Sequence, residues 1–141
     1  TPFEIGKGLV LWQGEKPRVA LLSTGSMAYE ALLAARALHA DGIESTVLHL
    51  ATVKPLDRDA VLKVAKAAGR VITIEEHQVA GGFGSAIAEC LSESYPVPVT
   101  RIGIQDTFGQ SGTPEELLAH YGLTSAHIAE VARTLVQKSI R

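Results

Sequence analysis

Residues 70–91 read RVITIEEHQVAGGFGSAIAECL, and this stretch decides the fold class. An apolar strand, an acidic turn with a histidine, a glycine-rich loop and an amphipathic helix follow one another directly. The helix has one apolar face, formed by Phe83, Ile87, Cys90 and Leu91. In an open α/β sheet, ligands or partners bind at such a corner, because strand ends and helix N-termini converge there. The stretch therefore marks the most promising functional surface of the chain.

The same order of strand and helix recurs along the chain. Short apolar runs predict buried strands over residues 18–23, 44–50, 71–74 and 97–104. Amphipathic helices are expected from Thr24, from Asp57 as N-cap, from the glycine loop and from Thr124 as N-cap. A further short helix is expected at 113–122, after a loop over 106–112 and with a capping box at its start.

The first strand is expected to run against the others. Residues 9–12 form a short apolar run, and the polar turn at 13–17 separates it from the next strand. We expect these two strands to pair as a hairpin. Strand–helix alternation then predicts a three-layer α/β/α domain whose mixed sheet is mostly parallel, with four core strands and one antiparallel strand.

Composition excludes several classes of protein. The 141 residues carry a net charge of −2, which gives no electrostatic case for nucleic acid or an anionic membrane. An apolar share of 46% supplies a sizeable core. No apolar run is as long as a membrane span. The single cysteine, Cys90, excludes an internal disulfide and fits a reducing cytoplasm.

The glycine-rich loop is a candidate phosphate cradle. Gly81, Gly82 and Gly84 follow a strand and open a helix, where backbone amides bind anions readily. Their spacing matches neither GxGxxG nor a P-loop. The structural alternative is that the glycines allow a tight turn and a close approach of helix to sheet. A regulatory anion site would use the amides of Ser26 and of Gly82 to Ser85.

The triplet Glu75, Glu76 and His77 has the most chemical character in the chain. Two carboxylates beside an imidazole can serve as acid and base. On a strand, however, neighbouring side chains point to opposite faces, so at most one carboxylate shares a face with His77. The alternatives are an interface or hydrogen-bond network, or one glutamate that caps a helix while the other is solvated.

The other reactive residue types form no recognisable site. The remaining histidines lack metal-ligand spacing, and no cysteine cluster exists. Ser111 does not lie in a nucleophile elbow, and Cys90 lies on an apolar helix face. A free-standing enzyme would lack a nucleophile, a metal and an oxyanion hole near the triplet. The sequence therefore predicts no catalytic residue and no metal site.

An ordered set of fragments resembles a known family. In chain order these are PFEIGKG, STGSMAYEALLAA, VKPLD, EEHQVAGGFGSAIAE, RIGIQDTFGQSGTPEELLAHYGLT and IAEVARTL. Each fragment alone is weak, but together they resemble the C-terminal domain of the transketolase family, with transketolase itself the nearest member. The domain of 1-deoxyxylulose-5-phosphate synthase is similar at EEHQVAGGFGSAI but differs at DTFGQSG. The β subunits of 2-oxoacid dehydrogenases differ more at the corner.

The resemblance implies that this chain and other domains of the enzyme have different roles. Residues 1–8 would be the tail of a linker from an upstream pyrimidine-binding domain, and residues 9–141 the C-terminal domain, with a five-stranded mixed sheet. The family binds thiamine diphosphate and Mg2+ in other domains, in the same chain or in a separate subunit, so we expect no cofactor in this chain. The expected role is non-catalytic: structural support and homodimer packing for two-carbon ketol transfer between sugar phosphates. Glu75, Glu76, His77, Ser26 and the loop from Gly81 to Ser85 would then form a contact or regulatory surface.

Overall fold

One mixed β-sheet forms the centre of the protein. The structure is a computed structural model that describes residues 7–51, 55–78, 82–104 and 124–138. Its five strands are β1 (Leu9–Gln13), β2 (Val19–Ser23), β3 (Ser45–His49), β4 (Val71–Gln78) and β5 (Val99–Ile104). They lie in the order β1-β3-β2-β4-β5, with β1 antiparallel and the others parallel. The predicted mixed sheet with one antiparallel strand is confirmed.

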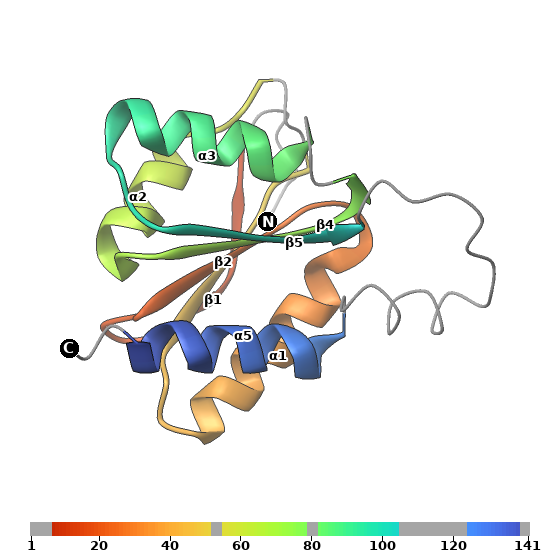
Figure 1. Ribbon diagram of the computed structural model, residues 1–141, viewed down its shortest axis with the longest axis vertical. Helices are drawn as coiled ribbons and strands as arrows, with labels where there is room; N and C mark the ends of the chain where they lie inside the picture. Colours follow the sequence, from red (N-terminus) through yellow and green to blue (C-terminus); the bar gives the residue numbers. More distant parts are fainter. Residues whose placement is uncertain (1–6, 52–54, 79–81, 105–123, 139–141) are drawn as a thin grey trace, which may run out of the picture.

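Helices cover both faces of the sheet, as the strand–helix alternation predicts (Figure 1). One layer holds α1 (Ala28–Ala40) and α5 (Ser125–Lys138), and the other holds α2 (Arg58–Ala68) and α3 (Phe83–Ser94). Side chains of β2 alternate between the layers, because Val19 and Leu21 pack with α1 and α5 whereas Leu22 packs with α2 and α3. A strand buried on both faces explains the uninterrupted apolar run of β2.

The predicted hairpin of the first two strands is wrong. The structure pairs β1 with β3, and β2 lies on the far side of β3. The turn between β1 and β2 crosses the start of β3 and bonds to it: Gly14 N donates to Ser45 O and Arg18 N to Glu44 O, both at 2.9 Å. The connection between β1 and β2 therefore passes over the start of β3. The antiparallel direction of β1 was predicted correctly, but its neighbouring strand was not.

The strand of the organising stretch is longer than expected. A strand over 71–74 followed by a turn was predicted, but β4 continues through Glu75, Glu76 and His77 to Gln78. Its register with β5 shifts between Ile74 and Gln78. Glu75 and Glu76 therefore lie in extended backbone, so their side chains leave the sheet on opposite faces.

Helix ends follow the local signals in the sequence. Asp57 caps α2 through its side chain, and Gly69 ends the helix at a φ of 80°. Gly42 takes a φ of 78° after α1, and Thr124 Oγ1 accepts from His127 N at the start of α5. A short 3-10 turn, η1 (Gly25–Met27), precedes α1. The helix predicted at 113–122 and the loop before it lie outside the described residues. Within the described ranges, every helix is too short or too polar to cross a membrane.

We expect Gly84→Ala to lower the free energy of unfolding by about 1–3 kcal/mol, although alanine favours helix. An added Cβ would lie 2.8 Å from Thr73 Oγ1, which is fully buried, and 2.8 Å from Arg101 Cγ. Urea unfolding followed by circular dichroism measures the change. Ser92→Ala, on the exposed side of α3, is the matched control and should stay within about 0.5 kcal/mol of wild type. Equal stability of the Gly84 variant and wild type would contradict the close packing described.

Candidate functional site

The carboxyl edge of the parallel strands gathers the residues singled out in the sequence. The loop after β2 leads to α1 on one face, and the loop after the adjacent β4 leads to α3 on the other (Figure 1). This is the topological switch point of the sheet, where α/β proteins usually bind ligands. Ser26 lies after β2, and Glu75 and Glu76 lie near the end of β4. Ser26 and Glu76, from the ends of two adjacent strands, thus come together at the edge where a ligand would be expected.

Glu75 and Glu76 each accept a hydrogen bond from the start of a different helix. Glu75 Oε2 accepts from Gly84 N at 3.0 Å, in the first turn of α3. Glu76 Oε1 accepts from Ser26 N at 3.0 Å, in the turn that begins α1. Glu75 is only 2% exposed, whereas Glu76 is half-buried. The strand alternation separates the carboxylates to opposite faces, which argues against a shared acid–base pair.

The other two described helices begin in the same way. Asp57 Oδ1 accepts from Ala60 N at 3.2 Å in α2, and Glu30 Oε1 accepts from Ser125 N at 2.8 Å in α5. A carboxylate at a helix N-terminus satisfies a free amide and interacts favourably with the helix dipole. Each of the four described α-helices thus has a carboxylate on one amide, either in its first turn or, for α1, in the 3-10 turn before it. An anionic ligand at these helix starts would compete with the carboxylates for these four amides.

Gly25 allows the close approach of Glu76 to η1. Its φ of 61° lies in the left-handed region, and an added Cβ would lie 2.8 Å from Glu76 Oε1. The backbone conformation favours glycine here, and a larger residue would also displace the Glu76 carboxylate. Gly25 thus permits the contact between Ser26, after β2, and Glu76, near the end of β4. The sequence around it has no nucleotide-binding spacing.

The remaining candidates fall into two groups. Gly82 is the N-cap of α3, and Ser85 Oγ accepts from Arg101 Nη1 at 3.1 Å. His77 belongs to β4, but its side chain is outside the described part of the structure, as is Gly81 altogether. The structure therefore joins Ser26 with Glu76 and Gly84 with Glu75, and leaves the predicted role of His77 open to test.

A serine–histidine pair at this edge, with the serine buried and the histidine half-buried, was not predicted. Ser23 and His49 end the adjacent strands β2 and β3, and Ser23 Oγ and His49 Nδ1 share a hydrogen bond of 2.9 Å. Burial lowers the pKa of His49 below its ordinary value of about 6.5. Ser23 is fully buried, so its hydroxyl is closed to a substrate. Each residue is the polar end of an apolar strand. This pattern in the sequence could have placed both at the carboxyl edge of the sheet.

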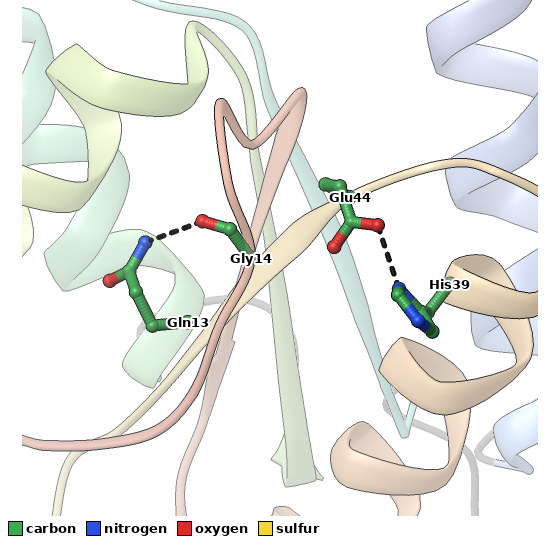
Figure 2. Close-up of polar contacts among 4 residues, drawn as sticks. All are labelled: Gln13, Gly14, His39 and Glu44. Carbon is green, nitrogen blue, oxygen red and sulfur yellow. Dashed lines mark hydrogen bonds and ion pairs between the residues drawn. The ribbon is translucent and has the colours of Figure 1, made fainter.

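A hollow of about 490 Å3 lies at the opposite edge of the sheet. Its lining residues are Trp12, Gln13, Glu15, Lys16, His39 and Glu44. Figure 2 shows His39 of α1 facing Glu44, with Nδ1 2.7 Å from Oε2, and Gln13 Nε2 donating to Gly14 O at 3.0 Å. The ring of Trp12 meets that of His39 edge-on, with centroids 5.8 Å apart. His39 is largely exposed, so this ion pair contributes little to stability.

Metal ligands do not gather anywhere in the described ranges, where no group of three or more histidine, cysteine, aspartate or glutamate side chains is placed to hold an ion. Cys90 is buried in α3, and burial raises the pKa of its thiol, so the thiolate is disfavoured.

We expect Glu75→Ala to destabilise the protein by about 1–3 kcal/mol, because the amide of Gly84 loses a buried acceptor. Glu76→Ala should cost less, about 0.5–1 kcal/mol, because water reaches the exposed amide of Ser26. Urea unfolding of the two variants compares them directly. A larger effect at Glu76 than at Glu75 would refute the assignment of the buried contact.

Acid should destabilise the wild-type protein partly through His49. Burial lowers the native pKa of this residue, so the unfolded chain binds a proton more readily and stability falls as pH decreases below about 6.5. In His49→Asn the loss of unfolding free energy between pH 7.5 and pH 5.5 should be smaller than in wild type. His127→Asn, at an exposed position, is the control and should keep the wild-type dependence. Identical pH profiles for His49→Asn and wild type would count against the burial.

Comparisons with known proteins agree on one family. A family model described as "Transketolase, C-terminal domain" matches residues 6–128. The 6-deoxy-6-sulfo-D-fructose transketolase subunit SqwH of Clostridium sp. (strain MSTE9) is 44% identical over 136 residues, which are 96% of this chain and 42% of that protein. The 1-deoxy-D-xylulose-5-phosphate synthase of Trichormus variabilis is 45% identical over 141 residues, 99% of this chain and 22% of that enzyme. The chain thus spans less than half the length of these relatives.

Solved structures give the same result. A structure titled "Split gene transketolase, inactive beta4 tetramer" is 44% identical, with a TM-score of 0.87 over 99% of this chain and 44% of the other. The transketolase of Campylobacter jejuni, at 16% identity, has a TM-score of 0.69 over 92% of this chain and 18% of the other, which shows a shared fold. With these matches over nearly its whole length, the chain belongs to the transketolase C-terminal domain family.

Proposed function

We propose that this chain is the non-catalytic structural and dimerisation domain of a thiamine diphosphate-dependent transketolase. The whole enzyme would move a two-carbon ketol unit from a ketose phosphate to an aldose phosphate. Thiamine diphosphate and Mg2+ would be held by other domains, in the same chain or in a partner subunit. A second copy of the chain would be a packing partner. The 44% identity to a transketolase subunit supports this choice of enzyme.

One observation carries the non-catalytic role. At the carboxyl edge of the sheet, where an α/β domain usually binds its ligand, Glu30, Asp57, Glu75 and Glu76 each bind one amide at a helix start. A diphosphate at this edge would have to displace one of these carboxylates or lie beside it. Like charges at such short range repel, which makes the edge a poor site for the cofactor. Glu75 and Glu76 also tie two helix starts to β4, which suits a scaffold.

A second whole-enzyme activity has specific support. The chain is 45% identical to a 1-deoxy-D-xylulose-5-phosphate synthase over 141 residues, as close as to the transketolase subunit. The full enzyme should therefore be assayed for formation of 1-deoxyxylulose 5-phosphate beside ketol transfer. A panel of ketol donors should include both ketose phosphates and 6-deoxy-6-sulfofructose, because the relative of Clostridium is named for that sugar. Product formation in one assay and not in the other decides between the two.

We expect this 141-residue chain alone to give no saturable heat with thiamine diphosphate in the presence of millimolar Mg2+ by isothermal titration calorimetry. Carboxylates already bind four of the amides at the helix starts, and the described residues supply no ligand cluster for Mg2+. The triple variant Glu30→Gln, Glu75→Gln, Glu76→Gln is an informative comparison, since it removes three negative charges and keeps side-chain acceptors. Saturable binding of the cofactor by the wild-type chain would overturn the proposal.

A further inference from the structure

Asp57 binds two amides that lie far apart in the sequence. Its Oδ1 accepts from Ala60 N at 3.2 Å and caps α2. Its Oδ2 accepts from Gly8 N at 2.8 Å, 49 residues earlier in the chain and directly before β1. One side chain therefore joins the segment that enters the domain to the first turn of a helix at the carboxyl edge of the sheet.

Gly8 lies against the core, where an added side chain would have to displace leucine methyl groups. An added Cβ would lie 2.9 Å from both Leu48 Cδ1 and Leu50 Cδ2. Both leucines are buried in the core shared with α2 and α3, so neither can move away freely. The entering segment thus lies directly on the core at the end of β3, and the bond to Asp57 fixes it there.

The chemistry of this contact selects a carboxylate. Two amides approach from different sides, and each needs its own acceptor oxygen. Asparagine offers one acceptor oxygen and a donor that would face the second amide, and serine offers a single short hydroxyl. A charged acceptor also makes a stronger bond to an amide than a neutral one. The N-cap alone requires none of this, because serine, asparagine and aspartate cap helices about equally well.

We propose that Asp57 is a positioning residue that clamps the segment entering at Lys7 and Gly8 to the start of α2. The clamp fixes the path of the chain immediately before β1. Where the proposed function holds, it also fixes the direction in which the linker from the preceding domain reaches this one. Asp57 thus has two roles, of which capping α2 is the local one.

Cleavage by trypsin after Lys7 tests the clamp in the 141-residue chain. The side chain of Lys7 is exposed, but a protease must pull the Lys7–Gly8 backbone away from the domain to cut it. Asp57→Ser keeps an N-cap hydroxyl for Ala60 and lacks the second oxygen that holds Gly8. We expect its cleavage rate at Lys7–Gly8, followed by mass spectrometry, to rise about tenfold, because a bond to a charged group is lost.

Two further variants separate the clamp from general destabilisation. Asp59→Ser removes the same charge from the exposed first turn of α2 without touching Gly8, and should be cut at the wild-type rate. Gly8→Ala keeps the cap of α2 and pushes the segment off the core, so it should be cut as fast as Asp57→Ser or faster. An unchanged rate in Asp57→Ser, or an equal rise in Asp59→Ser, would overturn the clamp. If Asp57→Ser fails to fold, the rate in Gly8→Ala decides in its place.

The clamp and the proposed function fail separately. The trypsin experiment involves no cofactor and no sugar phosphate, so its result stands whatever the enzyme catalyses. Binding of thiamine diphosphate to this chain would refute the structural role and leave the clamp in place. Wild-type cleavage rates in both Asp57→Ser and Gly8→Ala would refute the clamp and leave the structural role in place.

Discussion

Hydrogen bonds from helix-start amides to carboxylates are the interaction on which this domain depends. A parallel sheet with strand–helix crossovers places the N-termini of its helices at one edge, where their free amides and positive dipole ends accumulate. Four carboxylates each accept a hydrogen bond from one of these amides. The amide belongs to the residue's own helix for Asp57 and to another part of the chain for Glu30, Glu75 and Glu76. Glu75 and Glu76 tie the starts of α3 and of η1 to β4, Glu30 joins α1 to α5, and Asp57 caps its own helix. At each of these helix starts, one amide that a ligand could use is thereby closed by a carboxylate of the protein itself.

The sequence predicts those structural features that residues close together in the chain determine, such as helix caps and buried strands. The N-cap Asp57 and the buried run of β2 are local signals, and both are confirmed. Local sequence does not determine whether β1 pairs with β2 or with β3. The expected hairpin with β2 is wrong because β3 lies between the two strands. The bond from Ser125 to Glu30 joins residues 95 positions apart, and that between Ser23 and His49 depends on strand order. Such pairs arise only once the topology is known, which is why the sequence indicated the glutamates at the corner but not their helices.

A closed edge changes the meaning of the residues that first suggested chemistry. Glu75 and Glu76 resemble an acid–base pair in the sequence, yet the extended β4 sends them to opposite faces and each is used to hold a helix. The glycines beside them serve close packing: Gly25 makes room for Glu76, and Gly84 for Thr73 and Arg101. The chain belongs to the transketolase C-terminal domain family, and the proposed supporting role rests on these contacts. The clamp at Asp57 extends the same device, a carboxylate on a backbone amide, to the segment through which the chain enters the domain.

The most direct test of a closed carboxyl edge is an NMR titration that observes the amides themselves. Backbone amide resonances of Ser26, Ala60, Gly84 and Ser125 would be followed in a 15N-labelled chain during addition of inorganic phosphate and then of thiamine diphosphate. If the carboxylates occupy these amides, none of the four resonances shows a saturable shift up to millimolar ligand. A saturable shift confined to Ser26 and Gly84 would show that an anion displaces Glu75 and Glu76, and would contradict the account.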